Sequence, residues 1–125
     1  MPISGKERIV AQESKYYMPT FSRQPLVIER GTGAIVTDTE GNDYIDCAAG
    51  IAVNSVGHCH PHVVNAIKAQ AEKLIHTSNL YYTEIQARLA ERMTKLTGME
   101  RLYLTNSGAE SNESAMKLAR KVTGK

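Results

Sequence analysis

The sequence has no apolar run long enough to cross a bilayer. Its longest such stretch, Ile45 to Val53, is interrupted by Asp46 and falls far short of the roughly 20 residues that a transmembrane helix requires. The opening segment is polar and contains Glu7 and Glu13, which is unlike a secretory signal or an organelle transit peptide. We therefore expect a cytoplasmic protein that does not enter a membrane.

The net charge of the chain is small, and cysteines are few. The 125 residues carry a formal net charge of +2, and the basic side chains are scattered, so there is no electrostatic footprint for nucleic acid. Two cysteines, Cys47 and Cys59, do not suggest a disulfide framework. Apolar residues make up 42% of the chain and charged residues 22%, which is typical of a globular protein and unlike a disordered one.

The first half of the sequence predicts a small antiparallel β element. A short helix at most is expected near residues 6–12, followed by irregular chain. Three short β-type runs then occur at residues 26–28, 34–37 and 44–47. Gly31 and Gly33 are expected to separate the first two runs, and the loop from Asp38 to Asn42 has the residue types of a hairpin turn.

After residue 57 the apolar period changes from two to about 3.6, which indicates helices. Pro61 suits the first turn of a helix whose apolar stripe continues to Ile75. A second helix is predicted after Thr83, which has capping-box spacing with Gln86. Gly98 is placed to end that helix. Together with the preceding hairpin, this order of elements predicts an α/β fold.

The last part of the chain begins a unit that it does not complete. The run from Leu102 to Thr105 is predicted to be a strand leading directly into a third helix, as in a parallel βα unit. Parallel strands need neighbours and are covered on both faces, yet no later strand follows. The simplest interpretation is that the sequence is the start of a longer protein.

The turn before the third helix has the most informative pattern. Ser107 and Glu110 have capping-box spacing, and Gly108 allows a ligand to approach the backbone. Free amides and the helix dipole favour an anion at such a helix start. On spacing alone, Ser107 can equally be an ordinary cap, and the sequence lacks both the Walker lysine and the three-glycine dinucleotide pattern. The residues therefore predict an anion site without naming its ligand.

A cluster of histidines invites comparison with a zinc site. His58, Cys59, His60 and His62 are residue types that bind zinc, but Pro61 is expected to start a helix and so break the alternation that would align the imidazoles. No second ligand cluster occurs in the sequence. We expect a structural turn with neutral, hydrogen-bonded histidines, and no metal.

Several short segments are each weak signals, but their combination is specific enough to indicate a protein family. They are Gly31-Thr32-Gly33, Asp38 to Asp46, Ala49 to Val53, Gly57 to Pro61, His76 to Tyr82, and Thr105 to Arg120. In this combination the sequence resembles the N-terminal part of a class III aminotransferase, of fold type I among the pyridoxal-phosphate enzymes. The resemblance implies an N-terminal arm and β-hairpin of the small domain in residues 1–57. It implies the start of the large α/β cofactor-binding domain in residues 58–125.

The resemblance also implies a ligand for the anion site. In such enzymes the segment matching Ser107, Gly108 and Ala109 binds the phosphate of pyridoxal 5'-phosphate. The cofactor ring acts as the electron sink, and a lysine forms the covalent link and moves the proton. That lysine and the residues that hold the ring are expected beyond Lys125. We therefore expect no catalytic residue in this chain and no amino transfer by the chain alone.

The substrates implied are an ω-amino acid such as N-acetylornithine and the acceptor 2-oxoglutarate. Phe21 and Ile51 match positions beside the substrate, and the absence of a hydroxyl at both argues against ornithine. Ornithine and 4-aminobutyrate remain alternative donors. Asn79 and Tyr81 match a loop near the partner's active site, so a homodimer is expected for the full-length enzyme.

Each of these side chains can also be simple packing. Two further interpretations stay open from the residues alone. One is a non-catalytic anion-binding or interaction module, and the other is a subunit that completes its site with a separate polypeptide.

Overall fold

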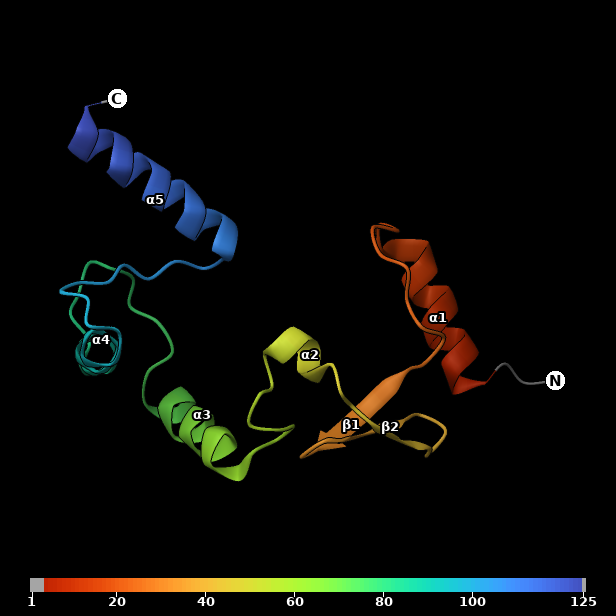
Figure 1. The fold of residues 1–125 in the computed structure, drawn as a ribbon. Helices are drawn as coiled ribbons and strands as arrows, with labels where there is room; N and C mark the ends of the chain where they lie inside the picture. The colour runs from red at the N-terminus through yellow and green to blue at the C-terminus, as the bar shows by residue number, and fades with distance from the viewer. Residues whose placement is uncertain (1–3, 125) are drawn as a thin grey trace. The chain divides into compact units, whose positions relative to one another are not determined.

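The computed structural model describes residues 4–124, which fall into two compact units, one ending at Ile75 and the other starting at His76. Figure 1 shows the chain as a ribbon coloured from its N-terminus to its C-terminus. The first unit contains α1 (Gly5–Tyr16), β1 (Ile28–Thr32), β2 (Ile35–Asp38), β3 (Asp43–Ile45), α2 (Ala49–Ala52) and α3 (Pro61–Lys73). The second contains α4 (Glu84–Thr97) and α5 (Gly108–Thr123). These compact units do not test the expected domain boundary after residue 57, which stays a prediction.

Helix α1 is longer than the predicted segment 6–12, and a capping box starts it. The Ser4 hydroxyl accepts a hydrogen bond from the Glu7 amide at 3.1 Å, and the Glu7 carboxylate accepts one from the Ser4 amide at 2.9 Å. Two backbone donors that a helix start leaves unpaired are thereby satisfied. The spacing of Ser4 and Glu7 is visible in the sequence and would have identified this helix start.

The three strands form an antiparallel sheet in the order β1-β2-β3, and β1 and β2 lie side by side in Figure 1. The prediction that Gly31 separates the first two strands is wrong, since Gly31 lies inside β1 and pairs with Val36. Gly33, with φ of +58°, makes the turn instead. Strand β1 also starts later than predicted, at Ile28. The antiparallel β element itself is confirmed.

The predicted hairpin loop is confirmed, and Asp38 organises it. Its carboxylate accepts hydrogen bonds from the backbone amides of Glu40 and Asn42, each at 2.9 Å, and from the Tyr44 hydroxyl at 2.9 Å. The Asn42 side-chain amide donates to the same carboxylate at 3.0 Å. Asp38 is only 3% exposed. A buried charge of this kind is stable only where donors surround it.

The chain after the sheet contains a short turn. Residues Ala49–Ala52 form α2, but their backbone is left-handed, with φ of +48° at Ala49, +62° at Gly50, +57° at Ile51 and +66° at Ala52. Helix α3 then begins with Pro61 in its first turn, as predicted. It ends at Lys73, before the predicted end of the apolar stripe at Ile75.

In the second unit, Gly98 ends α4 with φ of +72°, as predicted. Thr83 precedes α4 as its N-cap residue, but its side chain makes no capping hydrogen bond, so the predicted capping box with Gln86 is wrong. Thr83 therefore marks the start of the helix by its extended backbone alone. Spacing identifies where a cap residue stands but does not fix the rotamer that completes the bond.

The predicted strand from Leu102 to Thr105 is absent from this part of the structure. A strand forms by pairing with a neighbour, and within residues 76–124 no other segment is a strand. The apolar run is therefore a connection without ladder hydrogen bonds. It leads directly into α5, as the sequence indicated.

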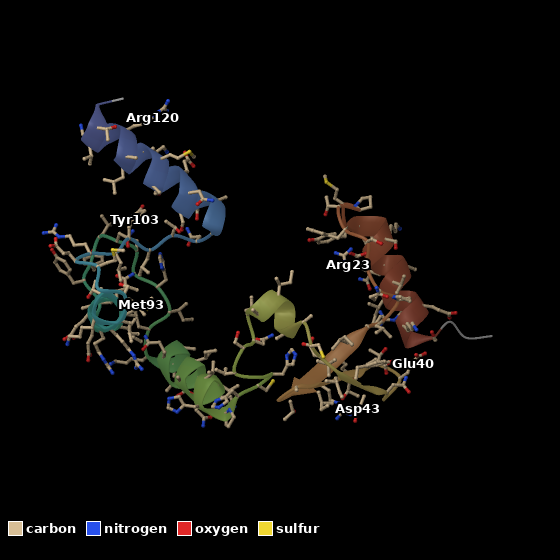
Figure 2. All side chains as sticks on the ribbon, in the orientation of Figure 1. Arg23, Glu40, Asp43, Met93, Tyr103 and Arg120 are labelled. Atoms are coloured by element: carbon tan, nitrogen blue, oxygen red, sulfur yellow. The ribbon has the colours of Figure 1, made fainter. Side chains whose placement is uncertain are left out.

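Many apolar side chains on the helices are exposed. None of the hydrophobic residues in the described range 4–124 is fully buried. Ile67 on α3 is 63% exposed and Met116 on α5 is 62% exposed. Figure 2 shows Met93 among the side chains that project from α4. In residues 4–124, every helix is too short or too polar to cross a membrane.

Candidate cofactor-phosphate site

The candidate site is the turn that precedes α5. Ser107 has an extended backbone, with φ of −154° and ψ of 161°, and is the N-cap of the helix. Its hydroxyl accepts a hydrogen bond from the Glu110 amide at 3.2 Å. The first backbone bond of the helix runs from the Ser111 amide to the Ser107 carbonyl at 3.0 Å. The expected capping role of Ser107 is thus confirmed.

The amides of Gly108 and Ala109 are free to bind a ligand. Among residues 4–124, no group accepts a hydrogen bond from either amide. A side-chain carbon added at Gly108 would meet nothing within 4 Å, so the approach to the turn is open. Two amide donors at the positive end of a helix dipole are chemically suited to a phosphate group. The residues present therefore fit an anionic ligand.

Glu110 lies close to this turn and stabilises it in an unexpected way. Its carboxylate accepts a hydrogen bond from the Asn106 amide at 2.8 Å and lies 3.3 Å from the Ser107 hydroxyl oxygen. The predicted bond from Glu110 back to the Ser107 amide is therefore replaced by one to the preceding residue. Because the Ser107 hydroxyl is already engaged with Glu110, the backbone amides are the donors most available to an anion.

A second pair of hydroxyls holds the turn against the helix. Thr105 Oγ1 donates to the Ser107 carbonyl at 3.1 Å and lies 2.5 Å from Ser111 Oγ. These contacts connect the last residues of the connection with the first turn of α5. The amides of the turn are thus held in place before any ligand arrives, which lowers the entropy cost of binding.

A polar groove of about 520 Å³ lies beside this turn within the second unit. Its lining includes Asn79, Tyr103, Thr105, Asn106 and Glu110, and Tyr103 is labelled in Figure 2. Asn79 is thus brought near the turn, which its position in the sequence did not indicate. Tyr81 is 67% exposed and does not line this groove.

Of the two residues expected beside the substrate, Phe21 lines a groove and Ile51 is exposed to solvent. The groove has a volume of about 570 Å³ and lies between α1 and the segment that leads to β1. Arg23 supports it by pairing with Glu13 at 2.8 Å and by covering the Tyr17 ring at 4.9 Å. Arg23 is labelled beside α1 in Figure 2. Ile51, on α2, is 93% exposed.

The histidine segment contains a contact that the sequence did not predict. His58 Nε2 lies 2.6 Å from Asp46 Oδ2. The pKa of Asp46 is held below its ordinary value, first by this contact with His58 and then by the amides of Ala49 and Ala48. The expectation of a structural turn with a hydrogen-bonded histidine agrees with this arrangement. In the described residues, no group of three or more His, Cys, Asp or Glu side chains could hold a metal ion.

Comparison with known proteins identifies the family. The segment 16–125 matches the family described as Aminotransferase class-III, which is consistent with a small antiparallel sheet followed by a helix whose start is open to a phosphate. The chain belongs to the class III aminotransferases.

Three relatives show how similar the chain is to known members. It is 62% identical over 124 residues to acetylornithine aminotransferase of Methanosarcina acetivorans, covering 99% of this chain and 31% of that protein. A solved ornithine aminotransferase from Toxoplasma gondii, described with partial occupancy of PLP at its active site, is 38% identical with a TM-score of 0.90, covering 96% of this chain and 28% of that one.

The third relative is a solved taurine:2-oxoglutarate aminotransferase from Bifidobacterium kashiwanohense, in complex with PLP and glutamate. It is 31% identical with a TM-score of 0.88, covering 100% of this chain and 29% of that one. The chain thus spans about a third of the length of the curated relatives it matches, such as the 31% covered in the Methanosarcina acetivorans protein. These similarities confirm the expected N-terminal part of the fold.

Proposed function

We propose that this chain is part of a pyridoxal-phosphate-dependent aminotransferase that moves an amino group from N-acetylornithine to 2-oxoglutarate. The observation that supports it best is the open pair of amides at Gly108 and Ala109 in a member of this family. The names of two relatives that are 62% identical to this chain support the amine donor. The taurine:2-oxoglutarate enzyme supports the acceptor.

Within this proposal, the turn before α5 binds the phosphate of the cofactor. The Gly108 and Ala109 amides donate hydrogen bonds to it, and each bond to a charged group contributes about 1.5–3 kcal/mol. Ser107 keeps the turn open by capping the helix through its own hydroxyl. When bound, pyridoxal phosphate supplies the electron sink for amino transfer. By anchoring its phosphate, the amides of this chain fix the position of the cofactor.

The amine donor is proposed to contact Phe21 and Ile51. Both side chains are apolar and exposed. They can therefore contact the aliphatic chain of a donor, but they have no hydroxyl that could bind the free amino group of ornithine. This favours N-acetylornithine over ornithine, and 4-aminobutyrate is the other alternative. We also propose a cytoplasmic homodimer, in which Asn79 and Tyr81 lie in a loop near the partner's active site. The side chains of Asn79 and Tyr81 are polar groups suited to an interface rim.

The test uses a chimera in which this chain replaces its matching segment in the Methanosarcina acetivorans enzyme. Purified chimera is mixed with 2-oxoglutarate and each of the three donors in turn, and glutamate formation is measured. We expect a specificity constant for N-acetylornithine at least about tenfold above the other two, a size typical of discrimination by an apolar pocket. The unmodified relative is the control.

Two outcomes would count against the proposal. Preference for ornithine or 4-aminobutyrate would assign a different donor to this chain. A folded chimera that neither binds pyridoxal phosphate nor forms glutamate would show that the turn before α5 does not serve this cofactor.

A further inference from the structure

The turn at α2 has a left-handed backbone conformation, which residues other than glycine rarely adopt unless other contacts hold them there. Ala49, Ile51 and Ala52 all have φ between +48° and +66°, in the left-handed region that favours glycine. Ile51 is the least expected of them, because a β-branched residue is rarely found there. Such conformations persist only where surrounding contacts impose them, and they are frequent at functional sites.

Asp46 imposes the conformation at the start of this turn. Its Oδ1 atom accepts hydrogen bonds from the backbone amides of Ala48 and Ala49, both at 2.9 Å. Its Oδ2 atom lies 2.6 Å from His58 Nε2. The carboxylate therefore connects Ala48 and Ala49, at the start of the turn, with His58, which lies beyond the loop that follows the turn.

His58 is in turn fixed to the sheet. Its amide donates to the Gly33 carbonyl at 2.8 Å, and its carbonyl accepts from the Gly33 amide at 3.0 Å. A side-chain carbon at Gly31 would lie 2.8 Å from His58 Cγ, and one at Gly57 would lie 3.0 Å from Gly33 Cα. Glycine at positions 31 and 57 thus makes room for His58 against the hairpin.

We infer that Asp46 and His58 are positioning residues that hold the left-handed turn at Ala49–Ala52 so that Ile51 faces the aliphatic chain of the amine donor. This inference rests on the proposed function. The pair closes the loop at both ends, and the turn between them presents an apolar side chain that is 93% exposed. Asp46 and His58 act through the backbone of the turn and do not touch the substrate.

The test removes the restraint in the same chimera. Asp46→Ala deletes all three contacts of the carboxylate, whereas Asp46→Asn keeps an oxygen for the Ala48 and Ala49 amides. We expect Asp46→Ala to raise the KM for N-acetylornithine by about tenfold, since misplacing a substrate contact is costly. Cofactor affinity should change by less than about twofold, because the phosphate donors belong to another segment. The KM of Asp46→Asn for N-acetylornithine should stay close to that of the parent chimera.

Asp38→Ala is the matched control. Asp38 also accepts hydrogen bonds from two backbone amides and a side chain in the same unit, but it holds the hairpin loop. This variant should lower the melting temperature and leave the KM for the donor unchanged. A purely structural role for Asp46 would give the same result as this control, and the inference would then be wrong.

A second variant covers the case in which Asp46→Ala does not fold. His58→Gln keeps the two Asp46–amide contacts and changes only the side chain on Oδ2, and we expect a smaller rise in the same KM. An unchanged KM in folded His58→Gln, with an active parent chimera, would overturn this inference alone, whether or not Asp46→Ala folds. An inactive parent chimera would instead overturn the proposed function.

Discussion

At the scale of single residues, Asp38 is the carboxylate most strongly affected by its surroundings. The side chain of Asn42 is the first cause that lowers its pKa to about 2 from 3.8, and burial opposes this shift. The folded form therefore favours the ionised carboxylate. Its contribution to stability is complete above the unfolded pKa of 3.8 and is lost as the pH falls toward about 2.

This shift gives a direct prediction for the hairpin. A carbon-13 NMR titration of the 125-residue chain should show the Asp38 carboxyl group protonating near pH 2. Tyr44→Phe removes the donor at 2.9 Å from Oδ2, so it should raise the pKa of Asp38 toward its ordinary value. A midpoint near 3.8 in the unsubstituted chain would mean that the hairpin donors are not in place.

Gly108 offers a second prediction at this scale, because proline can remove its amide without breaking the helix. Gly108 is the first residue of α5, where proline is tolerated, and the extended Ser107 before it suits a following proline. In the chimera, Gly108→Pro should weaken binding of pyridoxal phosphate about tenfold to a hundredfold, as expected for one lost charge-assisted bond.

Glu84→Pro is the matched control for that experiment. Glu84 is also the first residue of a helix, after the extended Thr83, but its amide has no proposed ligand. Fluorescence titration with the cofactor should give an affinity for Glu84→Pro close to that of the parent. Equal losses in both variants would show that proline disturbs the fold and that the Gly108 amide has no specific role.

At the scale of elements, most signals from neighbouring residues gave correct predictions, with the Thr83 capping box as an exception, whereas long-range pairing was not predicted. The start of α3 at Pro61, the end of α4 at Gly98 and the cap at Ser107 all depend on neighbouring residues. The candidate phosphate turn could therefore be found from the sequence, although its ligand came from resemblance. The predicted strand from Leu102 to Thr105 failed because pairing depends on a neighbour that no local pattern supplies.

The restraint on α2 lay beyond sequence reasoning for the same reason. The Asp46–His58 contact joins residues that are distant along the chain, and its only trace in the sequence is the glycine at positions 31, 33 and 57. Glycine is common in turns, so those positions suggested turns when they were considered one at a time. Gly31 in fact lies within a strand, where the absence of a side chain leaves room for the imidazole ring of His58.

Helix α1 gives a prediction at the element scale. Ser4→Ala removes the hydroxyl that caps it and should cost about 1 kcal/mol in the stability of that helix. Hydrogen exchange at the amides of α1 should then become faster by about fivefold, since 1 kcal/mol corresponds to that factor. Ser14→Ala, within the same helix, is the control and should leave exchange unchanged or slower. Equal effects would argue against the capping box.

At the scale of the whole molecule, the exposed apolar stripes predict marginal stability for the 125-residue chain. Without a partner surface, helices such as α4 and α5 gain little from packing, and exposed apolar patches promote association. We expect calorimetry of the chain to show a broad transition, and light scattering to show association. The chimera should melt cooperatively. A sharp two-state melt of the chain alone would contradict this expectation.

The crowding beside Gly31 matters to anyone who redesigns this hairpin. Position 31 lies in a regular strand, where a protein engineer would ordinarily exchange glycine for valine or threonine to improve sheet propensity. Here even one added methyl would stand 2.8 Å from an imidazole carbon, so a routine stabilising change would push the ring of His58 aside. A library that randomises this strand should therefore keep position 31 fixed.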